Sequence, residues 1–221
     1  MRVLGVDGCP GGWIAVLVDG DDVEWTYAAD IRDLLSTDVT AVGIDIPIGL
    51  PDAGTRACDV AARRLLGPRR SSVFAAPIRA VLGCASYAEA RALLAALGGP
   101  SMSAQAFGIV RAVRQVDDAL SPADSHRVIE VHPELVLRSL APSDLPPKKT
   151  ADGGAQRLAA LRAVWRDVDD LVAEAPRPAR REDAIDALAV AIGAGRWLRD
   201  EATVLGDDET DTRGLPMRIA F

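Results

Sequence analysis

The chain of 221 residues is 49% hydrophobic and 26% charged, which suits one compact domain with a sizeable core and no apolar stretch of the ~18 residues that span a membrane. Its formal net charge of −7 speaks against a general nucleic-acid coat protein, and its N-terminus lacks a basic, cleavable leader, so we expect a cytoplasmic protein. The three cysteines are scattered and odd in number, which argues against a disulfide framework and against structural zinc.

The first 46 residues alternate short apolar runs with turn residues, the pattern of closely connected strands. They predict strands at 2–7, 13–18 and 23–28, a short helix at 31–35 and a fourth strand at 41–46. The first three strands are expected to form an antiparallel meander because the turns between them are short and rich in glycine.

The stretch from about 52 to 125 is mainly helical in pattern, with a capping box that starts at Ser86. Its helices are expected at 55–66, 86–97 and 103–120. After it come a fifth strand at 126–132, a proline-rich loop at 141–150 that carries the only two lysines, helices at 154–173 and 182–200, and an edge strand within 215–221. The order predicts a single α/β domain over 1–221, with a mixed five-stranded sheet flanked by helices and a helical insertion between strands four and five.

Several acidic residues occupy positions that a folding chain usually gives to apolar side chains. Asp7 and Asp45 each end an apolar strand, and Asp186 lies among apolar residues of the last helix. Burying a lone carboxylate costs several kcal/mol, and two carboxylates about 4 Å apart repel by roughly 4 kcal/mol at an effective dielectric of about 20. If strands one and four pair in parallel, Asp7 and Asp45 emerge side by side at the edge where open α/β sheets place their ligands.

Asp183 and Asp186 lie three residues apart on a helix, so both side chains project from one face. A buried helix laid against the sheet can therefore bring one or both of them up to Asp7 and Asp45. The alternative is ordinary helix-start chemistry, since acids near a helix N-terminus are favoured by the helix dipole and by capping. That alternative accounts for Asp183 better than for Asp186.

Glu130 is embedded in an apolar strand, and His132 shares its strand face two residues on. Glu130 is a candidate catalytic acid, or it pairs with an arginine such as Arg56 or Arg127. His132 is a candidate proton shuttle, or a structural histidine.

Between Arg56 and Arg79 the chain carries six arginines against a single acid, Asp59. This stretch is either a solvated helix face or a surface that binds phosphate, whose oxygens match the guanidinium fork. The candidate phosphate-binding residues are Arg63, Arg64, Arg69, Arg70, Ser71 and Ser72.

Ligands that are all oxygen suit Mg²⁺ or Mn²⁺ rather than zinc, which makes Asp7, Asp45 and Asp186 candidate metal ligands. Two such ions can stabilise both the attacking and the leaving oxygen in phosphoryl transfer. We therefore expect a metal-dependent enzyme of phosphoryl transfer.

Five segments of the chain resemble a domain-of-unknown-function family that is predicted to contain nucleases of ribonuclease-H-like fold: 5–13, 43–51, 69–74, 130–134 and 183–189. The last segment is also similar to the terminal helix of RuvC-type Holliday-junction resolvases, in which an acidic pair three apart completes a metal site. The resemblance implies a metal-dependent nuclease that acts on the phosphodiester bonds of a nucleic acid. It also implies a ribonuclease-H-like core with Asp7, Asp45, Asp183 and Asp186 as metal ligands. It implies for Glu130 a place as a further ligand or as an acid behind the ligands.

Two other classes of function remain open from the sequence. Actin-like phosphotransferases or phosphohydrolases share this core and also use a Gly-x-Asp-Gly turn, although they repeat the core in two lobes. A non-catalytic scaffold or partner-binding protein would neutralise its acidic cluster with internal arginines instead of metal.

Overall fold

The structure is a computed structural model that describes residues 1–148, 150–206 and 209–221. These residues form two compact units. The sheet unit comprises Met1–Asp45, His126–Val204 and Ala220–Phe221, and the helical unit comprises Ile46–Ser125 and Leu205–Ile219. Among the described helices, none combines the length and the apolar character needed to cross a bilayer.

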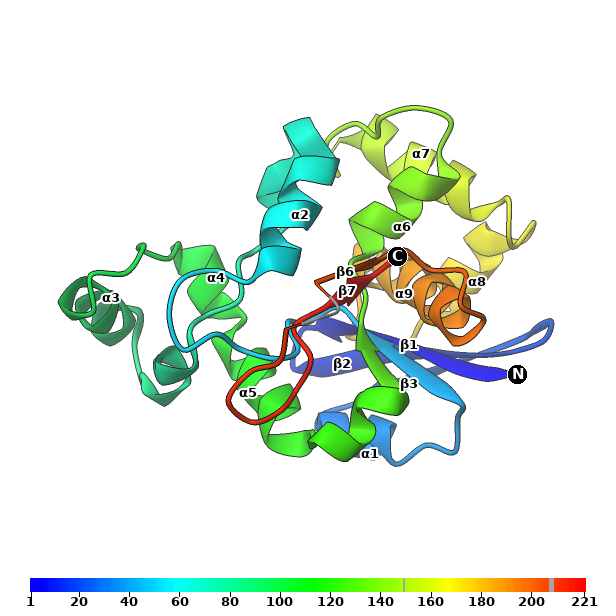
Figure 1. Cartoon of the computed structure of the whole chain (residues 1–221). Coiled ribbons are helices and arrows are strands. Elements are labelled where there is room, and N and C mark those ends of the chain that lie inside the picture. The colour runs from blue at the N-terminus through cyan, green and yellow to red at the C-terminus, as the bar shows by residue number, and fades with distance from the viewer. Residues whose placement is uncertain (149, 207–208) are drawn as a thin grey trace. The chain divides into compact units, whose positions relative to one another are not determined.

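The sheet unit is built on five strands: β1 Arg2–Cys9, β2 Gly12–Asp19, β3 Asp22–Ala28, β4 Ala41–Ile44 and β5 Val128–Glu130. Their order in the sheet is β3-β2-β1-β4-β5. The first three strands are antiparallel neighbours, whereas β4 pairs in parallel with β1 and β5 pairs in parallel with β4 (Figure 1). This is the mixed five-stranded α/β sheet that the sequence predicts, with the strand order of a ribonuclease-H-like sheet.

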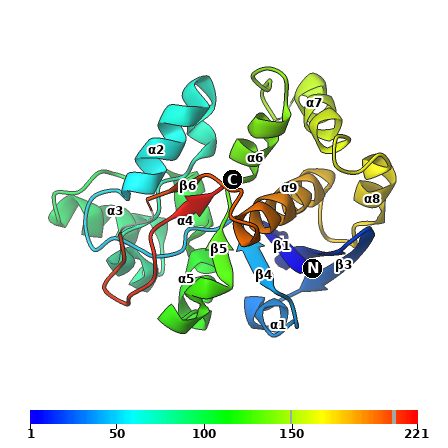
Figure 2. The ribbon, with the colours of Figure 1, turned by 45° about the vertical axis from the view of Figure 1, so that its right-hand side comes forward.

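Five helices belong to the same unit: α1 Ile31–Leu35, α6 Pro133–Leu140, α7 Ala151–Leu161, α8 Val168–Glu174 and α9 Arg181–Leu198. Helix α9 packs on β1, β2 and β4, and α1 contacts β2 and β3. Both views show α9 on one face of the sheet and α1 on the other (Figures 1 and 2). Helices α6, α7 and α8 each contact α9, so they extend the layer on its side of the sheet.

Helix α9 approaches the sheet very closely at two glycines that are partners in the β1–β4 register, Gly5 and Gly43. A Cβ atom on Gly5 would lie 2.3 Å from the carbonyl oxygen of Ala187 and 2.4 Å from the amide nitrogen of Ala191. One on Gly43 would lie 2.9 Å from a methyl group of Val190. The helix can rest on the strands because these positions carry no side chain and because its own contact residues are small.

The helical unit contains the predicted insertion between β4 and β5. Its helices are α2 Ala57–Leu66, η1 Gly67–Ser72, η2 Arg79–Gly83, α3 Tyr87–Ala96, α4 Ala104–Gly108 and α5 Val110–Ala119, followed by η3 Pro122–His126 at the boundary of the two units. Two short strands, β6 Val204–Leu205 and β7 Ile219–Ala220, form a separate two-stranded sheet. The predicted edge strand within 215–221 is therefore present, but only over two residues.

Strands β4 and β5 are shorter than the predicted 41–46 and 126–132, and three helical segments also differ from the sequence prediction. The helix expected over 103–120 is interrupted at Ile109, directly after Gly108, a residue that weakens a helix interior. The helix expected over 154–173 is two helices, because the backbone turns between Leu161 and Val168 although no proline or glycine marks the break. Helix α6 was not predicted, although Pro133 at its first position is a favoured helix start.

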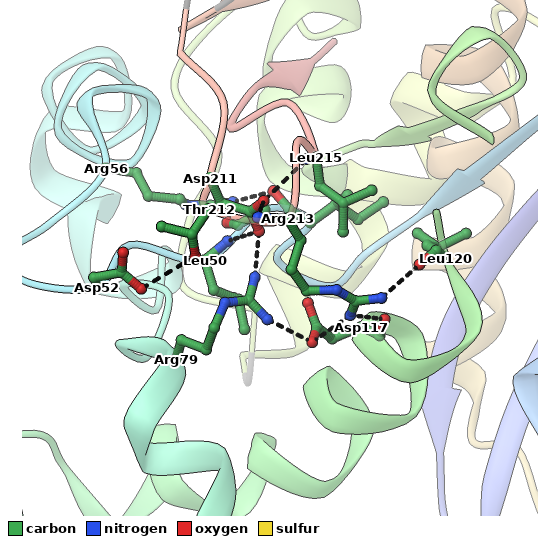
Figure 3. Close-up of polar contacts among 12 residues, drawn as sticks. Leu50, Asp52, Arg56, Arg79, Asp117, Leu120, Asp211, Thr212, Arg213 and Leu215 are labelled. Carbon is green, nitrogen blue, oxygen red and sulfur yellow. Dashed lines mark hydrogen bonds and ion pairs between the residues drawn. The ribbon is translucent and has the colours of Figure 1, made fainter. Parts of the chain in front are cut away.

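The carboxylate of Asp211 organises the C-terminal part of the helical unit (Figure 3). It accepts the amide hydrogens of Leu50 at 3.0 Å, Arg213 at 2.8 Å and Leu215 at 2.9 Å, and it forms an ion pair with Arg79. Although burial opposes its ionisation, these donors hold the pKa of Asp211 below its usual value. Asp211 thereby ties the segment 205–219 to the residues that follow β4.

Asp117 of α5 completes this network by receiving two guanidinium groups. Arg79 and Arg213 each donate to its Oδ2 atom at 2.7 Å, and Arg213 also donates to the carbonyl oxygen of Leu120 at 3.0 Å (Figure 3). Two arginines and two aspartates thus balance each other's charge inside the helical unit.

We predict that Gly5→Ala destabilises the protein by about 2–3 kcal/mol, because the new methyl group meets the backbone of α9, which cannot move aside without opening the core. Gly8→Ala is the matched control, since it makes the same change in the same strand and a Cβ there would meet nothing within 4 Å. Urea denaturation of the two variants measures the difference. Equal stabilities would contradict the proposed contact between α9 and β1.

We also predict that Asp211→Asn costs about 2–3 kcal/mol of stability, because an amide offers one acceptor oxygen where four donors converge and leaves Arg79 with less compensating charge. Glu209→Gln removes a carboxylate from an exposed side chain two residues away and should be nearly neutral. Thermal and urea unfolding at pH 7 compare the two. If Asp211→Asn matched its control, the network of Figure 3 would not hold this segment.

Candidate functional site: an acidic cluster with one lysine

Asp7 and Asp45 lie at the carboxyl ends of two adjacent parallel strands. Gly5 and Gly43 are register partners that face α9, and each aspartate follows its glycine by two residues. The amide of Asp45 still donates to the carbonyl oxygen of Val6 at 3.0 Å, so the strand pairing continues to this point. Because alternate residues of a strand share a face, both carboxylates are directed to the side of the sheet that α9 covers. The parallel pairing expected from the sequence is thus present.

Asp186 reaches the same place from the second turn of α9. It lies one residue before Ala187, which touches Gly5, and it is buried. The helix can bring it there only because of the close contact at the two glycines. Three carboxylates from three distant parts of the chain therefore meet at one edge of the sheet.

The electrostatics of the cluster show how strongly these three groups interact. Burial raises the pKa of Asp7 well above its usual value, and the charges of Asp186 and Asp45 raise it further. Burial and the charge of Asp186 do the same for Asp45. The pKa of Asp186 is raised to about 6, mainly by burial, even though a neighbouring lysine favours its ionised form. Ionising all three carboxylates is therefore costly in the folded protein.

That lysine is Lys148, which forms an ion pair with Oδ2 of Asp186. Burial opposes the charge of Lys148, but Asp186, with Asp7 and Asp45 behind it, raises its pKa nonetheless. No role was predicted for Lys148 from the sequence. A compositional signal was present: the chain carries 23 arginines and only two lysines, side by side in one loop. The second of them, Lys149, lies outside the described residues.

Asp183 begins α9 in the manner that helix-start chemistry predicts. Its Oδ2 atom accepts the amide hydrogen of Arg180 at 2.8 Å as part of a capping box. Burial raises its pKa, partly offset by this hydrogen bond. The charge of Asp183 also raises the pKa of Asp7, but less than burial, Asp186 and Asp45 do. Asp183 thus caps the helix and lies at the margin of the cluster.

Glu130 and His132 lie differently from the three aspartates. Glu130 is the register partner of Ile44, whereas Gly43 and its partner Ile129 face α9. Glu130 is therefore buried on the opposite face of the sheet, although its charge contributes to the raised pKa of Asp45. His132 is half-buried just after β5, as the N-cap residue of α6.

The candidate phosphate-binding residues belong to the helical unit, at the end of α2 and in η1. Arg63 donates to the carbonyl oxygen of Val73 at 2.9 and 3.1 Å, so it supports the backbone there. Ser72 donates to the carbonyl oxygen of Arg69 at 2.9 Å. Arg64, Arg70, Ser71 and Ser72 are exposed and Arg69 is partly exposed.

The remaining two arginines of the basic stretch have structural partners within the same unit. Arg56 is buried and binds Asp59 through two nitrogens, and Arg79 belongs to the Asp211 network. Asp59 in turn accepts the amide hydrogen of Ala76 at 3.0 Å. The excess of arginine in this stretch is therefore partly a property of the fold.

The chemistry of the donor set suits a hard divalent cation, because Asp7, Asp45 and Asp186 offer only carboxylate oxygens. Within the part of the chain that the structure describes, however, no three histidine, cysteine, aspartate or glutamate side chains are placed to ligate one ion as they stand. The Lys148 ammonium lies at Asp186 instead. A cation bound there would have to compete with that ammonium.

The fold and the site together define an α/β protein with a ribonuclease-H-like sheet and an acidic cluster at the carboxyl ends of its central strands. The chain belongs to the family described as Protein of unknown function (DUF429), whose model matches residues 5–211 and so includes every member of the cluster. Neither a curated protein nor a solved structure matches the chain.

We predict that Asp7→Asn makes the folded protein more stable than wild type at pH 8, and that the advantage shrinks toward pH 4. The pKa of Asp7 is raised on folding, so between the unfolded-state value of about 4 and the folded value the native state binds more protons. Wild-type stability therefore falls as pH rises through this window, and an amide removes that loss. Its Oδ1 atom can still accept the Gly8 amide hydrogen that Asp7 accepts at 2.7 Å.

Urea unfolding from pH 4.5 to 8 measures this effect. The matched control is Asp38→Asn, because the Asp38 side chain is fully exposed and its loss should change little at any pH. A destabilised Asp7→Asn at pH 8 would mean that the Asp7 carboxylate is well compensated within the protein, contrary to the electrostatics described above.

Proposed function

We propose that the protein is a metal-dependent nuclease, which hydrolyses phosphodiester bonds at the cluster of Asp7, Asp45 and Asp186 with Mg²⁺ or Mn²⁺. The observation that carries the proposal is the convergence of three buried or half-buried carboxylates on a single lysine. Three carboxylates and one ammonium have a formal charge of −2 when all are ionised, which is the charge that one divalent cation offsets. A stable fold has little reason to gather such a cluster unless a ligand compensates it.

The residues present have distinct tasks in this proposal. Asp7 and Asp45 hold a cation from the sheet, and Asp186 holds it from the helix. When bound, the metal activates water and neutralises charge on the leaving oxygen. Glu130 and Asp183 add negative potential at the margin of the cluster, which favours a divalent over a monovalent cation.

The exposed basic residues of the helical unit supply the proposed contacts to the nucleic-acid backbone. Arg64 and Arg70 are exposed, and Arg69 is partly so. In the described residues none of the three forms an ion pair, so their guanidinium groups are available to phosphate. Ser71 and Ser72 add hydroxyl groups beside them. Arg63, which supports the Val73 backbone, positions this surface rather than contacting the nucleic acid.

Two other interpretations receive less support. An actin-like phosphotransferase repeats its core in two lobes, but the described residues contain a single five-stranded sheet. A non-catalytic protein would balance its acidic cluster internally. The Lys148–Asp186 ion pair goes part of the way, but the raised pKa values of Asp7 and Asp45 show that the balance is incomplete.

We predict that Mn²⁺ or Mg²⁺ at about 100 times its dissociation constant raises the melting temperature by about 5 °C or more, because a ligand at that excess adds about 2.7 kcal/mol. Under the same conditions the protein should cut at least one of four substrates: single-stranded, duplex, hybrid or branched nucleic acid. Asp7→Asn and Asp186→Asn should each lower the cutting rate by at least about 100-fold and abolish the thermal response. Asp38→Asn is the control.

The outcomes separate the interpretations. Metal binding without cleavage of any of the four substrates would contradict nuclease activity, and nucleotide hydrolysis in the same samples would favour a phosphohydrolase. A thermal response to neither ion would contradict the metal site itself and favour the non-catalytic protein.

A further inference from the structure

Lys148 lies at the boundary between the acidic cluster and a pocket of about 240 Å³ in the sheet unit. Its side chain is 37% exposed, whereas its partner Asp186 is only 10% exposed. The ammonium is therefore the more exposed partner of this ion pair. It contacts Asp186 of the cluster and is also accessible to solvent.

Two carbonyl groups just before Lys148 accept hydrogen bonds. Arg157 of α7 donates to the carbonyl oxygen of Pro146 at 3.0 Å, and its guanidinium forms a buried bidentate ion pair with Glu134 of α6. The hydroxyl group of Thr150 donates to the carbonyl oxygen of Pro147 at 2.8 Å. Arg157 thereby ties the residues that precede Lys148 to α6 and α7.

The pocket gives the Lys148 ammonium a second position, in which it would contact an anion bound in the pocket. It is lined by Lys148, Thr150 and Arg181, with Ile185 and Glu182 on the α9 side. The first turn of α7 also borders it, and there the helix dipole and amide hydrogens favour negative charge. Arg181 lies close to this turn, since a Cβ atom on Gly154 would be 3.8 Å from its Nη1. Lys148, Arg181 and a helix start thus border one space, and Arg181 also pairs there with the exposed Asp169, whose Oδ1 lies 3.7 Å from its Nη2.

We propose that Lys148 is an exchangeable counter-ion: it offsets part of the carboxylate charge in the metal-free protein, leaves Asp186 when a divalent cation binds, and then holds a substrate phosphate in the adjacent pocket together with Arg181. This rests on the proposed function, because it assumes that the cluster takes a metal. It assigns the pocket to a phosphate group of the nucleic-acid substrate.

The residue type fits this task better than the arginine used elsewhere in the chain. Lysine carries a compact point charge on a flexible four-carbon stem, whereas arginine would bind a carboxylate through two directed hydrogen bonds. A monovalent ammonium binds carboxylates less strongly than a divalent ion at a similar distance, because Coulomb attraction scales with charge. Replacing the ammonium with a divalent ion also offsets one more negative charge of the cluster.

The scarcity of lysine allows a direct test. Protein labelled with ¹⁵N-lysine gives side-chain ammonium signals from Lys148 and Lys149 alone, and Lys148→Arg assigns them. We expect saturating Mg²⁺ to shift the Lys148 signal away from that of an ion-paired ammonium. Thymidine 5′-monophosphate added to the metal-loaded protein should shift it again, but should not do so in Arg181→Met. A Lys148 signal unchanged by bound Mg²⁺, or unmoved by the nucleotide, would overturn the proposal.

Metal affinity gives a second readout that needs no catalysis. Removing a competing ammonium should tighten Mg²⁺ binding by Lys148→Met roughly tenfold in calorimetry, which corresponds to one unit charge at partly screened distance. Arg32→Met, which removes a cation from α1 on the opposite face of the sheet, should leave the affinity unchanged. The KM for a cleaved oligonucleotide should rise in Lys148→Met and in Arg181→Met.

The two proposals fail in different ways. If Mg²⁺ binds and nucleic acid is cut, but Lys148→Met binds the metal no more tightly than wild type, only the exchange is wrong. If neither wild type nor Lys148→Met binds a divalent ion, the metal site and the exchange are both overturned.

Discussion

The close approach of α9 to the sheet is the contact on which the arrangement of this protein depends. Gly5 and Gly43 lie side by side in β1 and β4, and the backbone of α9 occupies the space that their side chains would fill. Because the helix is so near, a carboxylate as short as that of Asp186 can reach the aspartates at the strand ends. A helix held at an ordinary packing distance, about 10 Å from the sheet, would leave these groups apart. The glycines therefore serve the site through the packing of the core.

The cluster that results lowers the stability of the fold that builds it. Burial raises the pKa values of Asp7, Asp45 and Asp186, the charge of Asp186 raises those of Asp7 and Asp45 further, and one partly exposed lysine offsets only part of the charge. The buried pair of Arg157 and Glu134 shows the contrast, since it is bidentate and carries further hydrogen bonds. The Arg157–Glu134 pair is thus compensated within the structure. The incomplete compensation at the sheet edge is what distinguishes a candidate site from a structural ion pair.

Much of this arrangement could be predicted from the sequence, and the rest could not, for physical reasons. The short turns between the first three strands predicted an antiparallel meander, and parallel pairing of strands one and four, taken there as a condition, placed Asp7 beside Asp45. The apolar residues around Asp186 predicted that the last helix is buried. What periodicity cannot supply is which loop folds over a site, and so the role of Lys148 was missed. Periodicity also does not show that Glu130 faces away from α9. Glu130 follows Ile129 by one residue, and Ile129 and its register partner Gly43 are on the face that α9 covers, so Glu130 lies on the opposite face.

The distribution of arginine in the helical unit bears on how tightly a nucleic acid could be held. Of six arginines between residues 56 and 79, Arg56 and Arg79 are engaged in internal ion pairs and Arg63 supports a backbone carbonyl. Only three are left to contact phosphate, and each such contact contributes one released counterion to binding. With a net charge of −7 over the chain, long-range attraction cannot make up the difference. In the nuclease that we propose, selectivity for the scissile bond would therefore arise close to the carboxylates, where the phosphate would meet a cation, and this places more weight on the lysine beside them than on the basic surface that dominates the sequence.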